Sequence, residues 1–211
     1  MSTEVDISNL ALAHIGDRAN IASLTEASAQ AAHCKRFYPI ARDTVLSSGV
    51  AWSFATKRSV MAALTLDVDS WDYKYSLPSD QLRLLVVLPA DAPQDHTGVP
   101  FIVENGAVYT NEITATARYV YKQYSVGVYP SLVVLAMARL LASYLAGPMI
   151  KGREGRAVSA DQYKNYLLEL AMAATHDANA SEHHITYVPS NIAARGSSLP
   201  QHLIVSPNDP R

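Results

Sequence analysis

The histidines close to the C-terminal end are the first residues whose types and spacing could support chemistry. His176 lies seven residues before His183, so a helix would place both on one face, and His184 follows directly. Imidazoles bind zinc when further ligands complete the site, but only Asp177 and Glu182 stand nearby. We interpret these histidines as side chains near a solvated helix end, and we predict neither a metal nor a cofactor.

The single cysteine, Cys34, follows His33, and a thiol beside an imidazole could act as a nucleophile with its base. Adjacent positions on a helix point about 100° apart, so these two side chains cannot easily pair. Cys34 also falls on an apolar helical stripe, where cysteine behaves as a small hydrophobic residue. The sequence has no Gly-x-Ser-x-Gly, no P-loop and no Gly-x-Gly-x-x-Gly. We therefore predict that the protein is not an enzyme and has no catalytic residue.

Two carboxylates at a suitable separation could hydrolyse a glycosidic bond. The candidates are Asp67, Asp69, Asp72 and Glu104. Their clustering in turns explains them more simply, and such an enzyme also needs a carboxyl group with a raised pKa in a cleft.

The stretch "KGREGR", from Lys151 to Arg156, combines glycine with basic residues and is similar to a phosphate-binding loop in composition only. We predict a solvated, glycine-rich loop between two helices. A contact of Lys151, Arg153 and Arg156 with a partner or a lumen is the second interpretation.

Composition limits what these residues can belong to. The chain has 211 residues, of which 49% are hydrophobic and 17% charged, which indicates one packed domain or one domain with an extension. A net charge of −2 provides no strongly basic face for gripping nucleic acid. We expect no signal peptide, because the N-terminus has no basic region and no long apolar run. We expect no contact with a membrane, because the most apolar segment, Leu132 to Ala146, is too short to span a bilayer and contains Arg139.

Helical periodicity covers the two outer parts of the first 180 residues. We expect a helix from Asp6, as its cap, to Ile15; a second from Thr25 to Gly49, kinked or divided at Pro39; an apolar one from Pro130 to Gly147; and a last one that begins at a capping box, Ser159 to Gln162. The expected apolar stripe of the last helix is Tyr163, Tyr166, Leu167, Leu170, Ala171 and Ala174.

Strand patterns fill the middle of the chain. Leu82, Leu84, Val86 and Leu88 are expected on one face of a strand, with Arg83, Leu85 and Val87 on the other. Asn105-Gly106 predicts the turn of a hairpin from Phe101 to Thr110, and Ile113 to Tyr124 is a further strand. Tyrosines gather here, and we predict that they form a contact surface for a partner, the other reading being an aromatic face that covers the helices. These candidates are Tyr73, Tyr75, Tyr109, Tyr119 and Tyr121.

The last 31 residues have no helical period but keep apolar positions, which favours an extended arm that docks on a neighbour over a floppy terminus. Candidate contact residues of the arm are Tyr187, Val188, Ile192, Leu203 and Ile204. The sequence thus predicts an α+β fold: a helix bundle formed by residues 1–66 and 129–180, a small antiparallel β-sheet domain inserted at 67–128, and an extended C-terminal arm at 181–211.

Two stretches carry a resemblance to a known family. "NLALAHIGDRANIASLTEASAQAAHCKRFYPIARDTVLSSGVAWSFATKR" (Asn9 to Arg58) has the layout N-x-A-L-x-x-I-G, I-x-S-L-x-E, A-x-x-C-x-x-x-Y-P-x-x-R-D and W-x-F-A. "YKYSLPSDQLRLL" (Tyr73 to Leu85) matches Y-x-Y-x-L-P-x-D-x-L-R-L. Both resemble the tail tubular protein A, or head-to-tail adaptor, family of short-tailed bacteriophages, with similarity from roughly Asp6 to Leu170.

This resemblance implies a structural part of a virion, made in the host cytoplasm and located at the head–tail junction. Members of the family are helix bundles with a small β domain that form a homo-oligomeric ring, usually a dodecamer. The ring joins the portal protein to the tail nozzle or tube protein, and DNA passes through its bore without specific binding. Lys151, Arg153 and Arg156 are then candidates for sparse contacts in the lumen. The alternative is a virion-associated peptidoglycan hydrolase.

Overall fold

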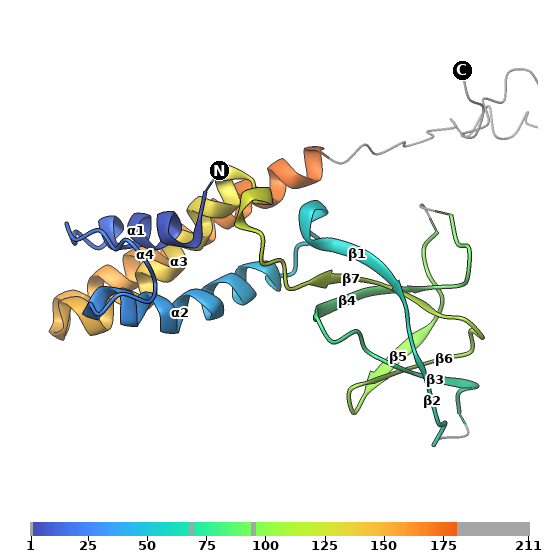
Figure 1. Cartoon of the computed structure of the whole chain (residues 1–211). Helices are drawn as coiled ribbons and strands as arrows, with labels where there is room; N and C mark the ends of the chain where they lie inside the picture. The colour runs from blue at the N-terminus through green and yellow to red at the C-terminus, as the bar shows by residue number, and fades with distance from the viewer. Residues whose placement is uncertain (1, 68–69, 94–95, 181–211) are drawn as a thin grey trace, which may run out of the picture. The chain divides into compact units, whose positions relative to one another are not determined.

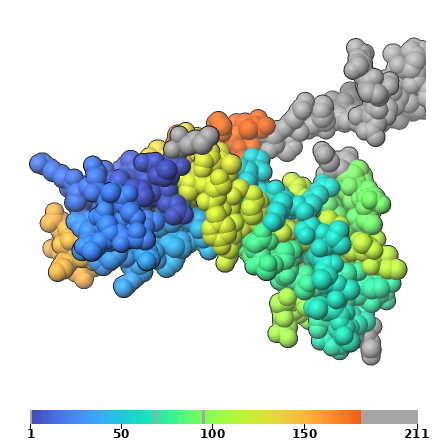
Figure 2. All heavy atoms as spheres, viewed as in Figure 1, coloured from blue at the N-terminus to red at the C-terminus, as the bar shows by residue number. Residues whose placement is uncertain are grey.

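The computed structural model describes residues 2–67, 70–93 and 96–180, and it confirms the predicted α+β fold class (Figure 1). Its four helices are α1 (Glu4–His14), α2 (Ala29–Leu46), α3 (Ser131–Ile150) and α4 (Gly152–Ala180). The apolar α3 contacts each of the other three and forms the centre of the bundle. Figure 2 shows α4 mainly at the edges of the bundle, because α1 and α2 lie in front of it in this view.

The helix starts differ from the predicted ones because other side chains supply the caps. Thr3, not Asp6, caps α1: its hydroxyl accepts a hydrogen bond from the Asp6 amide, and the Asp6 carboxylate accepts one from the Thr3 amide in return. Ser28 caps α2 by accepting a hydrogen bond from the Ala31 amide at 3.1 Å. Pro39 lies inside α2, which is one continuous helix and is not divided there.

The predicted basic loop is wrong. α3 continues through Gly147 to Ile150, only Lys151 separates it from α4, and α4 begins at Gly152. Lys151 and Gly152 make the reversal with φ angles of 61° and 62°. Gly155 serves packing, since a Cβ there would lie 2.9 Å from the Ala146 carbonyl oxygen of α3.

The predicted capping box is also wrong. Ser159 and Gln162 lie within α4, and both side chains bind other elements instead of capping this helix. The Ser159 hydroxyl donates to the Ser143 carbonyl of α3 at 2.7 Å. In this fold, a serine and a glutamine at this spacing hold α4 against α3 through side-chain hydrogen bonds.

Seven strands form two antiparallel sheets, here called the β region. Strands β1 (Thr56–Val60), β7 (Thr116–Tyr121) and β4 (Gln81–Leu88) form a three-stranded sheet in the order β1-β7-β4. A four-stranded sheet has the order β2-β3-β6-β5 and consists of β2 (Ala63–Leu64), β3 (Tyr73–Ser76), β6 (Ala107–Thr110) and β5 (Phe101–Glu104). The first two strands lie ahead of the predicted boundary at 67. Asn105 and Gly106 form the predicted hairpin turn, with φ angles of 46° and 73°.

Strand β4 does not keep the predicted alternation. Its register against β7 shifts between Gln81 and Arg83 and again between Leu84 and Val86. Leu82 and Leu85 consequently pack against the helical core, whereas Leu84 packs against the second core. The prediction that Leu82 and Leu84 share a face is wrong. The register shifts interrupt the regular alternation of the strand, so these two side chains point to different faces.

Strand β7, the middle strand of the three-stranded sheet, is covered on both faces, whereas the edge strand β1 is largely exposed. Val120 of β7 belongs to the core made with the helices, and the next residue back, Tyr119, belongs to a second core between the two sheets. Trp52 and Phe54, just before β1, pack on the helical core. Alternate residues of one strand thus join the bundle to the β region.

We expect Gly155→Leu to lower the free energy of unfolding by about 1–3 kcal/mol, because the new side chain must push α4 away from the Ala146 carbonyl. Ala157→Leu is the matched control: the position is exposed on the same helix, so the change should stay within about 0.5 kcal/mol. Urea denaturation measures both. Equal stabilities of the two variants would show that the seam tolerates a wider separation.

Candidate interaction surfaces

Three of the five tyrosines predicted as a partner surface are buried inside the fold. Tyr75 and Tyr119 are each 2% exposed, and Tyr109 is also buried, while Tyr73 and Tyr121 are partly buried against the same second core. The prediction is wrong for the three buried rings. Strand alternation turns Tyr75 and Tyr119 toward the core between the two sheets, whereas Tyr109 lies on the other face of β6, where Asp67 and Lys74 contact it.

Two of these rings are held by similar arrangements of charge. The Tyr119 hydroxyl donates to the Asp80 carboxylate at 3.0 Å, and the Lys57 ammonium contacts the same carboxylate at 2.5 Å. Lys57 also lies 4.6 Å from the centre of the Tyr121 ring. The hydrogen bond from Lys57 is the main cause that lowers the pKa of Asp80, and burial raises that of Tyr119.

The second arrangement lies in the four-stranded sheet. The Tyr109 hydroxyl donates to the Asp67 carboxylate at 2.9 Å, and Lys74 contacts Asp67 at 2.6 Å. Lys74 stands 5.4 Å from the centre of the Tyr109 ring. The hydrogen bond from Lys74 lowers the pKa of Asp67. Each of these Lys–Asp–Tyr groups satisfies the hydroxyl of a buried tyrosine, but only Tyr119 belongs to the second core.

The carboxyl groups give no support to acid catalysis in the described part of the chain. Those with a resolved shift all have a lowered pKa, whereas a general acid needs a raised one. They are Asp6, Glu26, Asp67 and Asp80. Cys34 is buried, and burial raises the pKa of its thiol to about 11, so it stays protonated at neutral pH.

The outward face of α4 is the principal uncovered apolar surface of the bundle. Leu168 and Met172 are 65% and 59% exposed, and Tyr163 and Leu167 beside them are about half exposed. The predicted stripe is therefore only partly correct, since Tyr166 faces the core but Tyr163 and Leu167 do not. The sequence signal was ambiguous because apolar residues occupy more than one side of this helix.

Polar residues occupy much of the buried side of α4. Gln162 donates to the His14 carbonyl of α1 at 3.0 Å and accepts from Arg139 of α3 at 3.0 Å. Arg139 in turn forms an ion pair with Glu169 at 3.0 Å. This network joins three helices and explains why the apolar α3 carries an arginine. Because polar residues take up part of the inner side of α4, several of its apolar residues lie on the outer side.

Two shallow grooves flank the outward face of α4. One is lined by Leu132, Ala171, Met172, Thr175, His176 and Asn179. The other, here called the α3–α4 groove, is lined by Ser143, Tyr144, Gly147, Arg156, Ser159, Ala160 and Tyr163. Small side chains form much of the second groove, so it could accept a protruding side chain of a partner.

The chain enters and leaves the β region through fixed joints. At the entry, the Asp177 carboxylate of α4 accepts hydrogen bonds from the Ser53 amide at 3.1 Å and the Ser53 hydroxyl at 2.7 Å. The Trp52 indole donates to the Val45 carbonyl at 3.1 Å. These bonds attach the last turns of α4 and of α2 to the start of β1.

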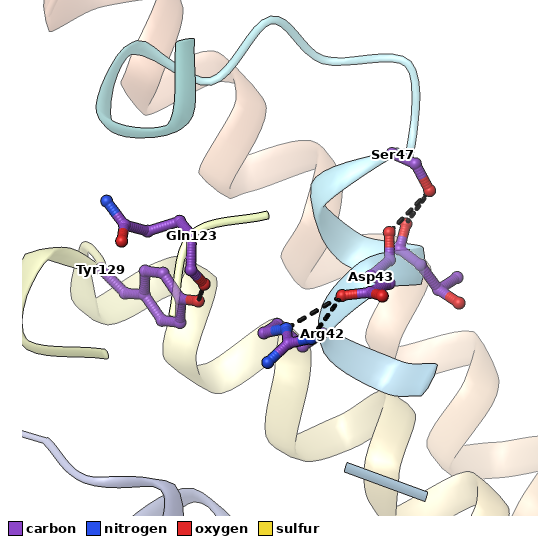
Figure 3. A network of polar contacts seen from close by, with 6 residues as sticks. Arg42, Asp43, Ser47, Gln123 and Tyr129 are labelled. Atoms are coloured by element: carbon purple, nitrogen blue, oxygen red, sulfur yellow. Dashed lines mark hydrogen bonds and ion pairs between the residues drawn. The ribbon is translucent and has the colours of Figure 1, made fainter. Parts of the chain in front are cut away.

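Figure 3 shows the joint at the exit. The Tyr129 hydroxyl donates to the Gln123 carbonyl, and the Arg42 guanidinium pairs with Asp43 at 2.8 Å. Arg42 also lies 4.5 Å from the centre of the Tyr124 ring, which ties the connection after β7 to α2. None of these partners was predicted, because each pair joins segments that are far apart in the sequence or depends on the local path of the chain.

The remaining predicted site residues fall into two groups. Lys151, Arg153 and Arg156 are exposed at the α3–α4 turn and the start of α4. The predicted contact residues of the arm lie outside the described residues; they are Tyr187, Val188, Ile192, Leu203 and Ile204. The described part of the chain contains no group of three or more metal-ligating side chains.

No family model matches the chain, and neither does any curated protein. α3 is long and apolar enough to cross a membrane by length and composition alone, but 56% of that window is buried inside the structure, as in a core helix.

We expect Asp80→Asn to lower the free energy of unfolding at pH 7 by about 0.2–1 kcal/mol, the range of partly exposed ion pairs. The folded-state pKa of Asp80 is lowered, so its contribution is present above the unfolded pKa and is lost as pH falls through the folded one. The difference from wild type should therefore shrink below about pH 4. Asp161→Asn is the control, because its ion pair spans 3.9 Å at the surface. A difference that persists at pH 2 would contradict this account.

Asp177→Ala should lower the free energy of unfolding by about 1–3 kcal/mol, because it leaves the Ser53 amide without its acceptor in a half-buried place. Ser53→Ala should cost less, since its amide still donates to Asp177. A double-mutant cycle with urea denaturation measures the coupling between the two residues. Additive effects would show that the Ser53 hydroxyl is not coupled to Asp177, and an unchanged stability of Asp177→Ala would show that this joint does not stabilise the fold.

Proposed function

We propose that this chain is a structural head-to-tail adaptor of a phage virion. Copies form a ring, a dodecamer by analogy with the family, that joins the portal protein to the tail nozzle or tube protein and lets DNA pass. The protein acts by contact and not by bond chemistry, and its place is the head–tail junction of the particle.

The main support for this proposal is that the outward face of α4 is apolar and exposed. A soluble monomer rarely exposes several large apolar side chains side by side, and larger patches of this kind mark interaction sites. Leu168 and Met172 lie one helical turn apart with more than half of their area exposed. Together with the resemblance over Asp6 to Leu170, this face supports a subunit of an assembly.

In such a ring, the β region would act as a rigid spacer. Its second core and its two Lys–Asp–Tyr groups hold the sheets, and its surface carries further exposed apolar side chains, including Val60 and Ile113. These positions replace the buried tyrosines as candidates for contact with the next tail component.

The charge of the chain fits a bore through which DNA slides. Tight binding would stall the DNA, and a net charge of −2 offers no strong attraction. Lys151, Arg153 and Arg156 are exposed and could make sparse contacts with phosphates. A peptidoglycan hydrolase has no specific observation in its favour.

Purified protein should form ring-shaped particles when mixed with the portal protein encoded in the same genome, and antibodies against it should detect it in purified virions. Negative-stain microscopy and light scattering measure the first, and immunoblotting the second. A zymogram on peptidoglycan should show no clearing. Absence from virions together with failure to bind the portal would overturn the proposal.

A further inference from the structure

The α4 ridge, defined here as Leu168 and Met172, projects from the helix side opposite to the core. Buried positions of the same helix include Tyr166, Ala173 and Asp177. A helix turns about 100° per residue, which puts the ridge on the other side from these three. Because this side chain pair is already more than half exposed, a partner can cover it without rearrangement of the bundle.

The α3–α4 groove lies on the same two helices as a second, different surface. Its lining includes the small residues Gly147, Ser159 and Ala160, between Tyr144 and Tyr163. Small residues let a leucine or methionine approach a helix backbone closely, and the two rings offer apolar walls. Arg156 is the only charged residue of this lining.

The chemistry of the second half of α4 favours an apolar protein surface as the partner of the ridge. Beyond Lys164, the exposed side chains of the described helix carry no Asp, Glu, Lys or Arg, because Glu169 is ion-paired with Arg139 and Asp177 is buried. Such a face attracts neither DNA phosphates nor a highly charged peptide.

The size of the face suits a second copy of the same chain. From Arg156 to Asn179 the face is about 35 Å long at 1.5 Å per residue, and one helix is about 10–12 Å wide. Its area of about 350–420 Å² is about half of the about 800 Å² that each partner of a standard interface buries, and the α3–α4 groove adds a second contact area on the same two helices. An exposed apolar ridge and a groove lined by small residues are both present in one chain, so no further protein is needed to complete such a contact.

We propose that the α4 ridge of one copy packs into the α3–α4 groove of the next copy. The contact joins two different surfaces, and repeated contacts of this kind close a ring when the rotation between copies divides a full turn. This inference rests on the proposed function for the ring itself, but the contact between copies can be tested without the portal.

A mixing experiment distinguishes this contact from others. The ridge variant combines Leu168→Glu with Met172→Glu, and the groove variant is Ala160→Trp; all three positions are exposed, so both variants should fold like wild type by circular dichroism. Each alone should lose self-association by about tenfold or more, as measured by light scattering over a concentration series. A mixture should form dimers that do not grow, because the ridge of one variant can still enter the groove of the other. Ile40→Glu, which changes an exposed apolar residue of α2, is the control and should assemble like wild type.

Cysteine pairing tests the same contact when association is weak. Leu168→Cys on one preparation and Ala160→Cys on another should form a disulfide-linked heterodimer under mild oxidation. The native Cys34 is buried and its thiol stays protonated, so it should not compete. Leu168→Cys mixed with Ile40→Cys should give no such product.

The outcomes separate this inference from the proposed function. If the ridge and groove variants still form rings with the portal and the cysteines do not pair, the ridge–groove contact is wrong while the adaptor function stands. If the cysteines pair but the wild-type chain neither binds the portal nor occurs in virions, the contact stands and the adaptor function is wrong. Dimers formed by either variant alone would point to a two-fold contact and overturn the inference.

Discussion

The burial of strand β7 on both faces is the constraint on which the rest of this structure depends. This strand places Val120 in the core with the helices and Tyr119 in the core between the sheets. A strand with two covered faces cannot shift its register by one residue without exchanging its side chains between two environments. The bundle and the β region are therefore linked by packing as well as by the two chain crossings, and a change in one core is felt in the other.

The close approach of α3 and α4 is the second constraint, and it determines which side of α4 stays outside. Gly155 lets α4 lie against the Ala146 carbonyl, and the Ser159 hydroxyl binds α3 in the next turn. Gln162 then enters the network around Arg139. With small and polar residues directed inward, Leu168 and Met172 remain at the surface. The uncovered ridge is thus a consequence of how α4 is fixed and not a local defect in packing.

Much of the fold follows from local patterns, and most of the site does not. The Asn105-Gly106 hairpin, the apolar α3 and the α+β class follow from turn chemistry and periodicity, which act over a few residues. The glycines at 152 and 155 looked like a loop because composition does not distinguish a flexible glycine from one that permits close packing. The tyrosines looked like surface residues for a related reason: their hydroxyls can be satisfied inside the fold by Asp80 and Asp67, and sequence spacing does not reveal those partners.

The hydrogen bonds between Asp177 and Ser53 link the packing of α4 against α3 to the packing of the three-stranded sheet. They connect the last turns of α4 to the residue that precedes β1, so the helix that carries the ridge is also bonded to the start of the β region. Trp52, buried beside this bond, donates to the end of α2 and leaves little freedom at the crossing. A partner that fixes α4 would then restrict the first strand as well, since bending the crossing must break buried hydrogen bonds. In a ring built through α4, the contact between copies would constrain both the helices and the surface offered to the next component.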